Sequence, residues 1–374
     1  MKKLTFIILC LEGAILSFNV AAAAALIPSI ARDFGVPAVT LGSIVWLYMI
    51  PYGLAALAYG PLVRVFDAKR VELVCFFFFS VANLMAAFSR TLVSLSVARF
   101  LMGAFGASVI PLVLILIARH TESAWRGKLV GTFFSATFVA SLVGLLLSGV
   151  LHWRLIFLIP AIAGFLLLVC MAVFLPRFAP EASHQKSNYK ATLADTRVLK
   201  FFTYIFLISF LYHGVQQWLG VYFSVRYGLS QMLVSALVTL TSLSGIFGEV
   251  IGGWFSDSVG RILTANVGIV LMVASCALLV FKMPFVALSV LMIVWGLGWT
   301  LNHAGISTIL TDLPREFLNE AASLNSGVRF LSGGLGMFLG GIVMQKSFIL
   351  GFSVAAVLLA ALLLFSKRLT KAIA

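Results

Sequence analysis

Apolar runs of about twenty residues follow one another along most of the chain, with short polar or charged turns between them. As a helix, a run of this length crosses a hydrocarbon layer of about 30 Å. Backbone groups in lipid must be paired inside the protein, which leaves only helices or closed β-barrels. Barrel strands would alternate in polarity over about ten residues, and the sequence has no such pattern. We therefore predict an all-α membrane protein.

Composition and run length together predict twelve transmembrane helices. Of the 374 residues, 62% are hydrophobic and only 10% are charged. A polar stretch over residues 176–198 has the composition of a flexible cytoplasmic linker. It would separate an N-terminal six-helix bundle, residues 1–175, from a C-terminal six-helix bundle, residues 199–374. The predicted spans are 5–27, 41–62, 71–89, 92–117, 129–151, 154–175, 199–223, 232–255, 263–281, 284–309, 322–345 and 348–366.

The net charge of +14 is distributed as in an inner-membrane protein. With the amino terminus inside, and with the span-end residues Arg154 and Lys200 counted with the adjoining loops, the cytoplasmic segments would hold 18 of the 26 Lys and Arg residues, the outer segments 6 and the spans 2. This positive-inside bias predicts a multi-pass protein of the bacterial inner membrane with both termini in the cytoplasm. The basic residues form no stripe that could follow a phosphate backbone, so nucleic-acid binding is not expected.

Two segments about 193 residues apart carry the same pattern. Residues 60–70 and residues 253–261 each place a glycine at a predicted membrane edge, followed by a short charged turn and a new apolar run. A second pair, residues 144–149 and 336–341, keeps nearly the same offset. Internal repeats of this kind are a signature of secondary transporters. The chain is therefore interpreted as a tandem duplication of one structural unit.

Three motifs give the chain a resemblance to a known family. The pattern Gly253-x-x-Ser-Asp257-x-x-Gly260-Arg261 resembles the loop motif between spans two and three, and eight and nine, of the major facilitator superfamily. Residues 95–106, with Arg99 and Gly103, resemble the arginine motif of its fourth span, and Trp153-Arg154-x-x-Phe157 resembles its entrance to span six. The resemblance covers nearly the whole chain and is greatest to the twelve-span drug and metabolite proton antiporters. It implies two pseudo-symmetric six-helix bundles that transport by alternating access.

The first copy of the loop motif and the fifth-span motif depart from the family pattern. Arg64 stands where the family usually has aspartate, and Asp67 where it usually has glycine. In the fifth-span pattern Gly-Pro-x-x-Gly-Gly, Leu145 replaces the proline and Ser148 a glycine. The resemblance implies a conformational role for eight loop residues: Gly60, Arg64, Asp67, Arg70, Gly253, Asp257, Gly260 and Arg261.

Small residues in predicted spans are expected to let helices approach closely, because hydrophobic burial gives no drive between helices in lipid. Glycines shared by both halves are best explained in this way. The predicted packing glycines are Gly103, Gly106, Gly144, Gly149, Gly336, Gly340 and Gly341.

Four charged residues inside predicted spans, Glu12, Arg99, Glu249 and Arg329, have no counterpart in the other half at this offset. Charges in the bilayer core are costly and usually mark pathways. We interpret them as proton-coupling candidates. Glu12 could instead lie at the inner membrane edge. Glu249 could instead pair with a nearby cation such as Arg329. Arg99 could be held against backbone carbonyl groups, or assist proton transfer or bind an anion as the arginine motif implies.

Polar and aromatic residues on spans 7 and 10, with a few on spans 1 and 2, predict a surface for an amphipathic organic solute. Packing roles for the histidines, and interfacial anchoring for the tyrosines, remain open alternatives. No metal centre or cofactor is predicted. The substrate candidates are Asn19, Tyr52, His213, Gln216, Gln217, Trp218, Trp295, Trp299, Asn302 and His303.

The sequence has no phosphate-cradling loop for ATP and no Gly-x-Ser-x-Gly motif, and its loops leave no room for a separate enzymatic domain. We therefore predict a monomeric secondary active transporter that exports a small organic solute in exchange for protons. Two alternatives remain: proton-symport uptake of a metabolite, and a non-transporting sensor or scaffold that keeps the fold.

Overall fold

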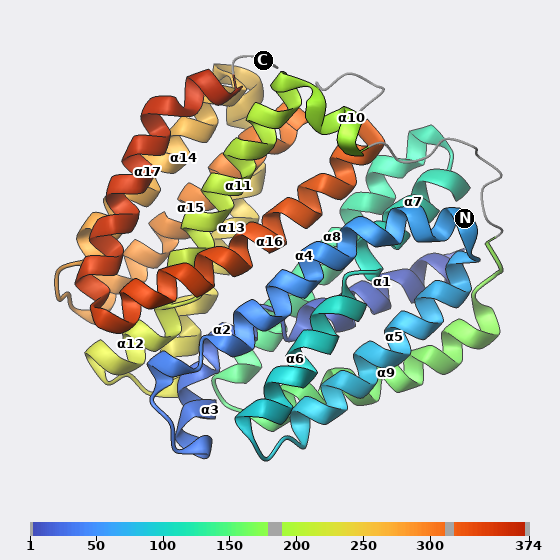
Figure 1. Cartoon of the computed structure of the whole chain (residues 1–374), viewed down its shortest axis with the longest axis horizontal. Coiled ribbons are helices and arrows are strands. Elements are labelled where there is room, and N and C mark those ends of the chain that lie inside the picture. Colours follow the sequence, from blue (N-terminus) through green and yellow to red (C-terminus); the bar gives the residue numbers. More distant parts are fainter. Residues whose placement is uncertain (1–2, 179–188, 311–317, 371–374) are drawn as a thin grey trace. The chain divides into compact units, whose positions relative to one another are not determined.

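The computed structural model describes residues 3–178, 189–310 and 318–370, and the regular structure of these ranges is entirely helical (Figure 1). Twelve segments are long and apolar enough to cross a membrane, and each overlaps a predicted span. The all-α, twelve-span prediction is therefore confirmed. The helices are α1 Lys3–Phe18, α2 Ala22–Ala25, α3 Ile27–Phe34, α4 Ser43–Val65, α5 Ala68–Ala87, α6 Leu92–Gly106, α7 Val109–His120, α8 Ser123–Ser148, α9 Trp153–Phe174, α10 Tyr189–Ala194, α11 Thr196–Gln216, α12 Leu219–Tyr227, α13 Gln231–Val259, α14 Arg261–Leu279, α15 Phe285–Leu310, α16 Leu318–Lys346 and α17 Phe348–Thr370, with a 3₁₀ turn at Ala38–Thr40.

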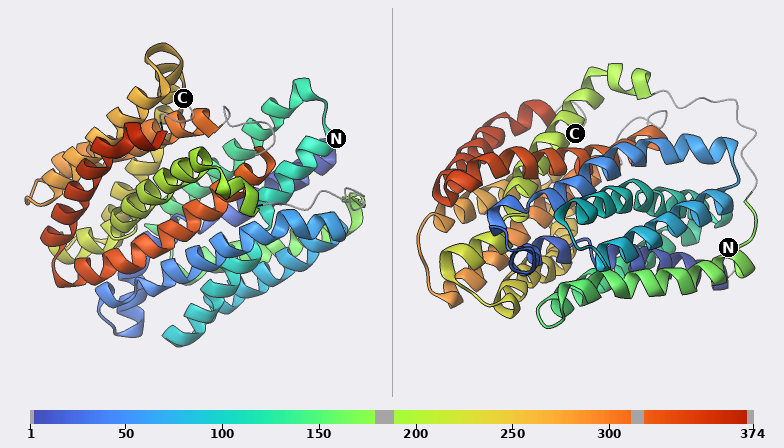
Figure 2. Two further views of the ribbon diagram at one scale, coloured as in Figure 1. Left: turned by 45° about the horizontal axis from the view of Figure 1, so that its top comes forward. Right: turned by 60° about the horizontal axis from the view of Figure 1, so that its bottom comes forward.

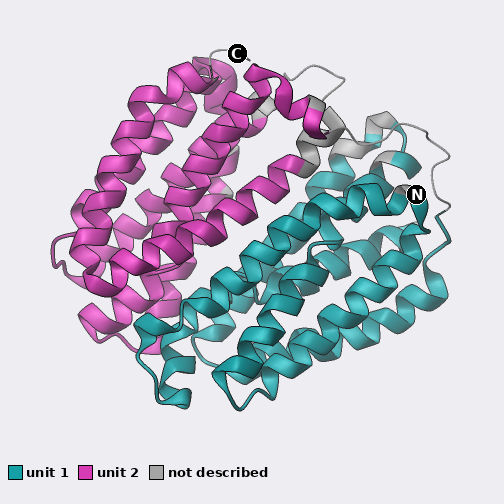
Figure 3. Cartoon of the chain, viewed as in Figure 1, with its two compact units in different colours: residues 1–187 teal, residues 188–374 magenta. Residues whose placement is uncertain are grey.

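The chain divides into two compact units, residues 1–187 and residues 188–374 (Figure 3). Residues 179–188 of the expected linker lie outside the described residues. The part that follows them is helical, since α10 precedes α11 directly. Asp195 caps α11 by accepting bonds from the backbone N–H groups of Arg197 and Val198. The Arg197 guanidinium binds the same carboxylate and holds the pKa of Asp195 at about 2.

The same set of helix contacts builds both units. In the first unit the main pairs are α1 with α8, α4 with α6, α5 with α6, and α5 with α9. In the second unit they are α11 with α16, α13 with α15, α14 with α15, and α14 with α17. Counted in spans, the second set repeats the first. Figure 2 shows one of these pairs, α11 in yellow-green beside α16 in orange-red. The internal repeat predicted from the loop and glycine patterns is thus a repeat of packing.

Three spans are interrupted within their length, which the sequence analysis did not predict. Span 1 breaks at residues 19–21 between α1 and α2, span 4 at residues 107–108 between α6 and α7, and span 7 at residues 217–218 between α11 and α12. At the second break the Ser108 hydroxyl donates to the Phe105 carbonyl oxygen. The backbone at Ala21, Ala107, Ser108, Gln217 and Trp218 keeps right-handed helical angles, so each interruption is a local distortion of the helix and not an unwound segment.

Two predicted packing glycines bring helix backbones together at equivalent places in the two units. A Cβ atom added at Gly144 of α8 would collide with the carbonyl oxygen of Phe18 in α1. A Cβ atom added at Gly336 of α16 would collide with the carbonyl oxygen of Phe210 in α11. Both members of the second contact lie 192 positions after those of the first. The contact that joins the first and fifth helices of each unit therefore requires glycine.

The other predicted packing glycines lie in similar surroundings. Gly103 faces the Tyr48 carbonyl, Gly106 faces Leu16 and Phe79, Gly340 faces Gly214, and Gly341 faces the Trp218 ring. Gly149 is different, because it is the C-cap residue of α8, directly after Ser148.

The loop motif is more helical than the expected charged turn. In the second copy, Gly253 and Asp257 lie within α13 and Arg261 begins α14, so Gly260 alone connects the two helices. Gly260 has φ 102° and ψ 147°, a conformation open essentially to glycine only. In the first copy, Gly60 and Arg64 lie within α4.

Asp67, one of the departures from the family pattern, caps the start of α5. Its carboxylate accepts a bond from the Arg70 backbone N–H at 3.2 Å. Its neighbour Lys69 donates to the carbonyl oxygens of Ala172 and Leu175 at 2.8 and 2.6 Å. A cation there satisfies the unpaired carbonyls at the end of α9 and complements the helix dipole. The loop is therefore fixed to the last helix of its own unit.

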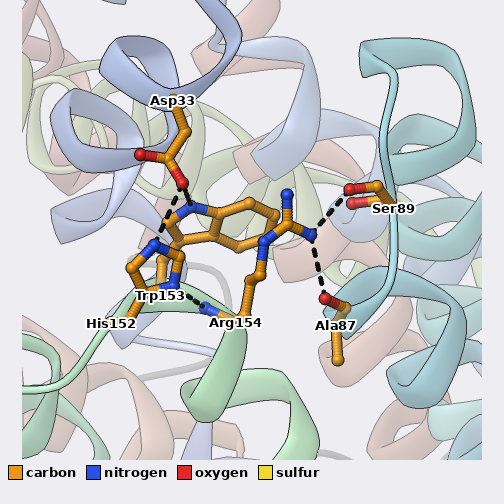
Figure 4. A network of polar contacts seen from close by, with 6 residues as sticks. All are labelled: Asp33, Ala87, Ser89, His152, Trp153 and Arg154. Carbon is orange, nitrogen blue, oxygen red and sulfur yellow. Dashed lines mark hydrogen bonds and ion pairs between the residues drawn. The ribbon is translucent and has the colours of Figure 1, made fainter.

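A polar network braces the start of α9 (Figure 4). Asp33 of α3 accepts a bond from the Trp153 indole at 2.7 Å and contacts His152 Nε2 at 3.0 Å. The Arg154 guanidinium lies over the Trp153 ring and donates to the carbonyl oxygens of Ala87 and Ser89 at 3.0 and 2.7 Å. The Trp-Arg motif at the entrance to span six thus ties α3 and the end of α5 to α9.

We expect Gly144→Ala to destabilise the protein, because the added methyl group must separate the backbones of α8 and α1. Overpacking of this kind costs about 1–3 kcal/mol or more, and the melting temperature in detergent should fall by several degrees. Gly131→Ala is the control on the same helix, since a Cβ atom there has nothing within 4 Å. Equal melting temperatures for the two variants would contradict this account of the contact.

Candidate functional site

The predicted site residues form two clusters, one in each unit. The first cluster centres on Glu12 of α1 and Glu72 of α5. The second centres on an aromatic stack between α11 and α15. Both clusters place polar groups in membrane-spanning segments, where an unpaired polar group is costly.

Glu12 and Glu72 face each other inside the first unit. Each is 0% exposed, and their carboxyl groups lie close enough to interact electrostatically. Among the described residues, neither carboxyl group has a hydrogen-bond partner. Glu12 is therefore placed in the interior of the unit.

A second polar pair links α1 to α5. The Asn19 side-chain amide, at the break in span 1, donates to Asn83 Oδ1 at 2.6 Å, and both residues are fully buried. Cys75 lies between the two pairs along α5 and contacts the Tyr59 hydroxyl at 3.6 Å. Asn19, predicted to face a solute, is thus placed in a contact between helices.

Arg99 is enclosed by its own unit. Its Nε donates to the Ile44 carbonyl oxygen of α4 at 2.7 Å, and its guanidinium lies 4.4 Å from the centre of the Tyr48 ring and 5.8 Å from that of Phe157. The side chain is 1% exposed. Of the two roles left open by the sequence, this geometry matches a cation held against a backbone carbonyl. Tyr52, a substrate candidate on α4, is buried beside Tyr48.

Three aromatic rings stack in the second unit. Tyr212 of α11 lies between Trp295 and Trp299 of α15, with ring centres 5.3 and 3.9 Å away and planes within 14° and 11°. Gln216 accepts a bond from the Trp295 indole at 2.7 Å and donates to Thr241 at 3.2 Å. His213 contacts Gln217 at 3.2 Å and meets the Trp299 ring edge-on. Trp295 and Tyr212 are buried, whereas Trp299 is part-exposed.

Glu249 and Arg329 do not pair with each other in the described structure. Glu249 Oε1 lies 2.7 Å from His303 Nδ1, and both side chains are about one-third exposed, at 38% and 32%. Arg329 Nε donates to Asn325 Oδ1 at 2.7 Å, and its guanidinium lies 6.0 Å from the Trp299 ring centre. The pairing of Glu249 with Arg329, left open above, is replaced by a Glu249–His303 contact.

Two further substrate candidates are buried in contacts between helices. The Trp218 indole donates to the Met337 carbonyl oxygen of α16 at 3.2 Å. The Asn302 amide donates to the Tyr204 hydroxyl at 2.6 Å and to the Ala265 carbonyl oxygen at 3.0 Å. Their polarity gave the correct location, within a span, but not the direction in which they face.

Comparison with known proteins gives the chain its family. The Major Facilitator Superfamily model matches residues 9–341. The chain belongs to the major facilitator superfamily. Its members are transporters rather than enzymes, so the chain is an integral multi-pass membrane transporter of small molecules.

Named relatives and solved structures agree with this assignment. The purine ribonucleoside efflux pump NepI of Salmonella paratyphi B is 24% identical over 329 residues, which cover 86% of this transporter and 82% of the relative. A crystal structure of a mutant nucleoside transporter NupG matches with a TM-score of 0.77 at 14% identity, over 98% of this chain and 100% of that one. A bacterial homologue of the human lysosomal transporter Spinster, inward-facing and unoccupied, matches with a TM-score of 0.81 at 12% identity, over 100% of this chain and 98% of that one. At these identities the structures establish the fold alone.

The sequence analysis missed Glu72 of the first cluster and Tyr212 of the second. Glu72 follows the basic pair Lys69 and Arg70 and is the second residue of the predicted span 71–89, so it resembled part of the loop. A signal was available. At the 192-residue offset of the glycine contacts, the counterpart of Glu72 is Thr264, and that of Glu12 is Tyr204. Like Glu12, Glu72 is an acidic residue that the repeated scaffold does not require.

The two arginines inside spans, Arg99 and Arg329, are expected to respond differently to substitution. Arg99→Gln should lower the melting temperature by several degrees, since a bond to a charged group contributes about 1.5–3 kcal/mol and the Ile44 carbonyl would lose its donor. Arg329→Gln should leave the melting temperature unchanged or raise it, because it removes a charged group whose terminal nitrogens are shielded from solvent and have no partner among the described residues. Thermal unfolding of the two purified variants measures the difference, and equal losses would contradict these assignments.

Proposed function

We propose that this transporter exports a small amphipathic organic solute in exchange for protons, by alternating access of its two units, and that Glu12 and Glu72 together carry the proton. The observation that supports this most strongly is the buried pair of carboxyl groups. The proposal also places the protein in a bacterial inner membrane with both termini in the cytoplasm, as the charge distribution predicts. We further propose that it acts as a monomer.

Adjacent carboxylates cannot both be ionised at little cost in a medium of low dielectric constant. Like charges at this separation repel strongly, and neither has a cation bound to it among the described residues. The pair therefore retains at least one proton while it is enclosed. If one conformation of the transporter admits water to the pair, hydration stabilises the ionised carboxylates and the shared proton can leave. Coupling requires only that the two conformations bind the proton with different affinity.

The Glu249–His303 pair in the second unit is a weaker candidate for the coupling site. Its two side chains are about one-third exposed and form an ion pair when His303 is protonated. We therefore assign proton coupling to Glu12 and Glu72, and Glu249 serves as the internal comparison.

The stack in the second unit supports a solute with a planar apolar part. An aromatic wall with a few fixed polar groups suits such a ligand. Gln216 ends α11 and Gln217 follows it, at the local distortion of span 7. One relative is named as a purine ribonucleoside efflux pump and one structural neighbour as a nucleoside transporter. Nucleosides combine a flat base with a polar sugar, so they are the first solutes to test, and the export direction follows the named pump.

We expect Glu12→Gln and Glu72→Gln to abolish solute movement driven by a pH gradient in reconstituted vesicles, because a neutral amide cannot exchange the proton. Exchange of labelled for unlabelled solute needs no net proton movement. Its rate should stay within about threefold of the wild-type rate, which corresponds to a change of about 0.65 kcal/mol in the activation free energy. A pH-sensitive dye inside the vesicles reports proton flux in the same samples.

Glu249→Gln is the matched control, since it neutralises a carboxylate of the other unit. It should retain gradient-driven transport. Accumulation by the Glu12→Gln, Glu72→Gln double variant at the wild-type level would exclude this pair as the coupling site. Accumulation driven by the opposite gradient would indicate proton symport and overturn the export direction.

A further inference from the structure

The aromatic stack of the second unit has one accessible end. Tyr212 is enclosed on both faces, and Trp295 is fully buried with its indole N–H bonded to Gln216. Trp299 is the part-exposed member, with Tyr212 on one side at 3.9 Å. Offset stacking is a preferred arrangement of aromatic rings, so a planar ligand would extend this series at Trp299. The protein supplies three rings whose planes are already aligned.

Arg329 is the charged group beside that end of the stack. Its guanidinium carbon lies 6.0 Å from the Trp299 ring centre. Its Nε is bonded to Asn325, but the two terminal nitrogens are shielded from solvent and have no hydrogen-bond partner among the described residues. Burying donors of a charged group without acceptors costs free energy. The site therefore has two donors in one plane that need acceptors.

Within the part of the chain that the structure describes, the neighbouring groups do not supply them. Glu249 lies within electrostatic range of Arg329, yet its carboxylate is engaged by His303 at 2.7 Å. Tyr204 also lies near Arg329, and its hydroxyl accepts the Asn302 amide. His213 lies near Arg329 as well and is bonded to Gln217. The missing acceptors can be provided by a ligand.

The geometry points to a specific recognition chemistry, which rests on the transport function proposed above. The second unit binds a planar heteroaromatic solute whose ring stacks on Trp299 and whose edge presents two in-plane acceptor atoms to Arg329. A guanidinium group donates two parallel bonds in a fixed fork, which matches two neighbouring acceptors in one plane. Guanine offers such a pair in its ring nitrogen and oxo group. Adenine carries an amino donor in place of the oxo group. The site should therefore distinguish the two rings.

Binding of guanosine and adenosine to the purified protein in detergent tests this inference. The two nucleosides are closely matched in size and share their sugar. We expect guanosine to bind about tenfold or more tightly than adenosine, in the range that a bidentate arginine contact gives. Arg329→Lys should reduce this preference to within about twofold, since an ammonium group has no fork. Trp299→Ala should lower the binding affinity for both nucleosides by about tenfold. Trp299→Phe keeps a stacking face and should retain most of the affinity.

Two controls separate recognition from misfolding. Arg197→Lys and Trp254→Ala remove an exposed guanidinium and an exposed indole elsewhere in the same unit and should not change either affinity. Melting temperatures of all variants show whether each is folded. Equal affinity of the wild type for the two nucleosides, an unchanged preference in Arg329→Lys, or no binding of either nucleoside would overturn the inference. Aromatic carboxylates binding in an Arg329-dependent way while guanosine does not would also overturn it, because the acceptors would then belong to an anion rather than a ring edge.

These measurements are made at equilibrium without a pH gradient. Their failure therefore leaves the proton-coupling proposal standing. Conversely, if the Glu12 and Glu72 variants contradict the proton-coupling proposal, the nucleoside selectivity of the Trp299 and Arg329 site can still be measured.

Discussion

Hydrocarbon offers no hydrogen-bonding partner, so every polar group inside a membrane-spanning helix must find its partner in the protein. Most of the buried polar groups here meet this requirement. Arg99 is bonded to the Ile44 carbonyl, Asn19 to Asn83, and Asn302 to Tyr204 and Ala265. Among the described residues, the exceptions include neutral atoms, such as the Tyr48 hydroxyl and the Oδ1 atoms of Asn19 and Asn302, and charged side chains. Neither carboxyl group of Glu12 and Glu72 accepts a bond, and the terminal nitrogens of Arg329 have no partner among the described residues. On the proposal made above, a proton completes the carboxyl pair and a solute completes Arg329.

The repeat separates scaffold from chemistry. The same four pairs of spans build both units, and the glycine contacts of Gly144 and Gly336 lie 192 positions apart. At that offset Glu12 corresponds to Tyr204, Glu72 to Thr264, and Arg329 to Thr137. The scaffold is thus symmetric, while the ionisable groups are not. Symmetry supplies two similar units, and the unmatched side chains give each unit a different task in the proposed cycle.

Much of the fold was predictable because hydropathy is a property of a single segment. The twelve spans follow from run length and composition alone, and the family follows from local motifs such as Gly253 to Arg261. What a segment faces was harder to predict, because it depends on a partner distant in sequence. Glu72 stood next to basic residues in the chain, yet it meets Glu12 in space. Trp218 and Asn302 were correctly placed in spans but face other helices. The breaks in spans 1, 4 and 7 contain no proline and were likewise not visible in the hydropathy.

The assignment of proton and solute to different units has a mechanistic consequence. On this proposal, Glu12 and Glu72 bind the proton in the first unit, and Trp299 and Arg329 bind the solute in the second. The two ligands do not compete for one group, so direct displacement cannot couple them. Coupling must then be carried by the change between the two access states, each of which the proton and the solute stabilise to different degrees. Such coupling is reciprocal: if protonation changes the affinity for the solute by a given factor, the solute changes the affinity for the proton by the same factor. A transporter built in this way can alter its solute specificity at Arg329 without altering its energy source, because the residues that select the solute are separate from those that hold the proton.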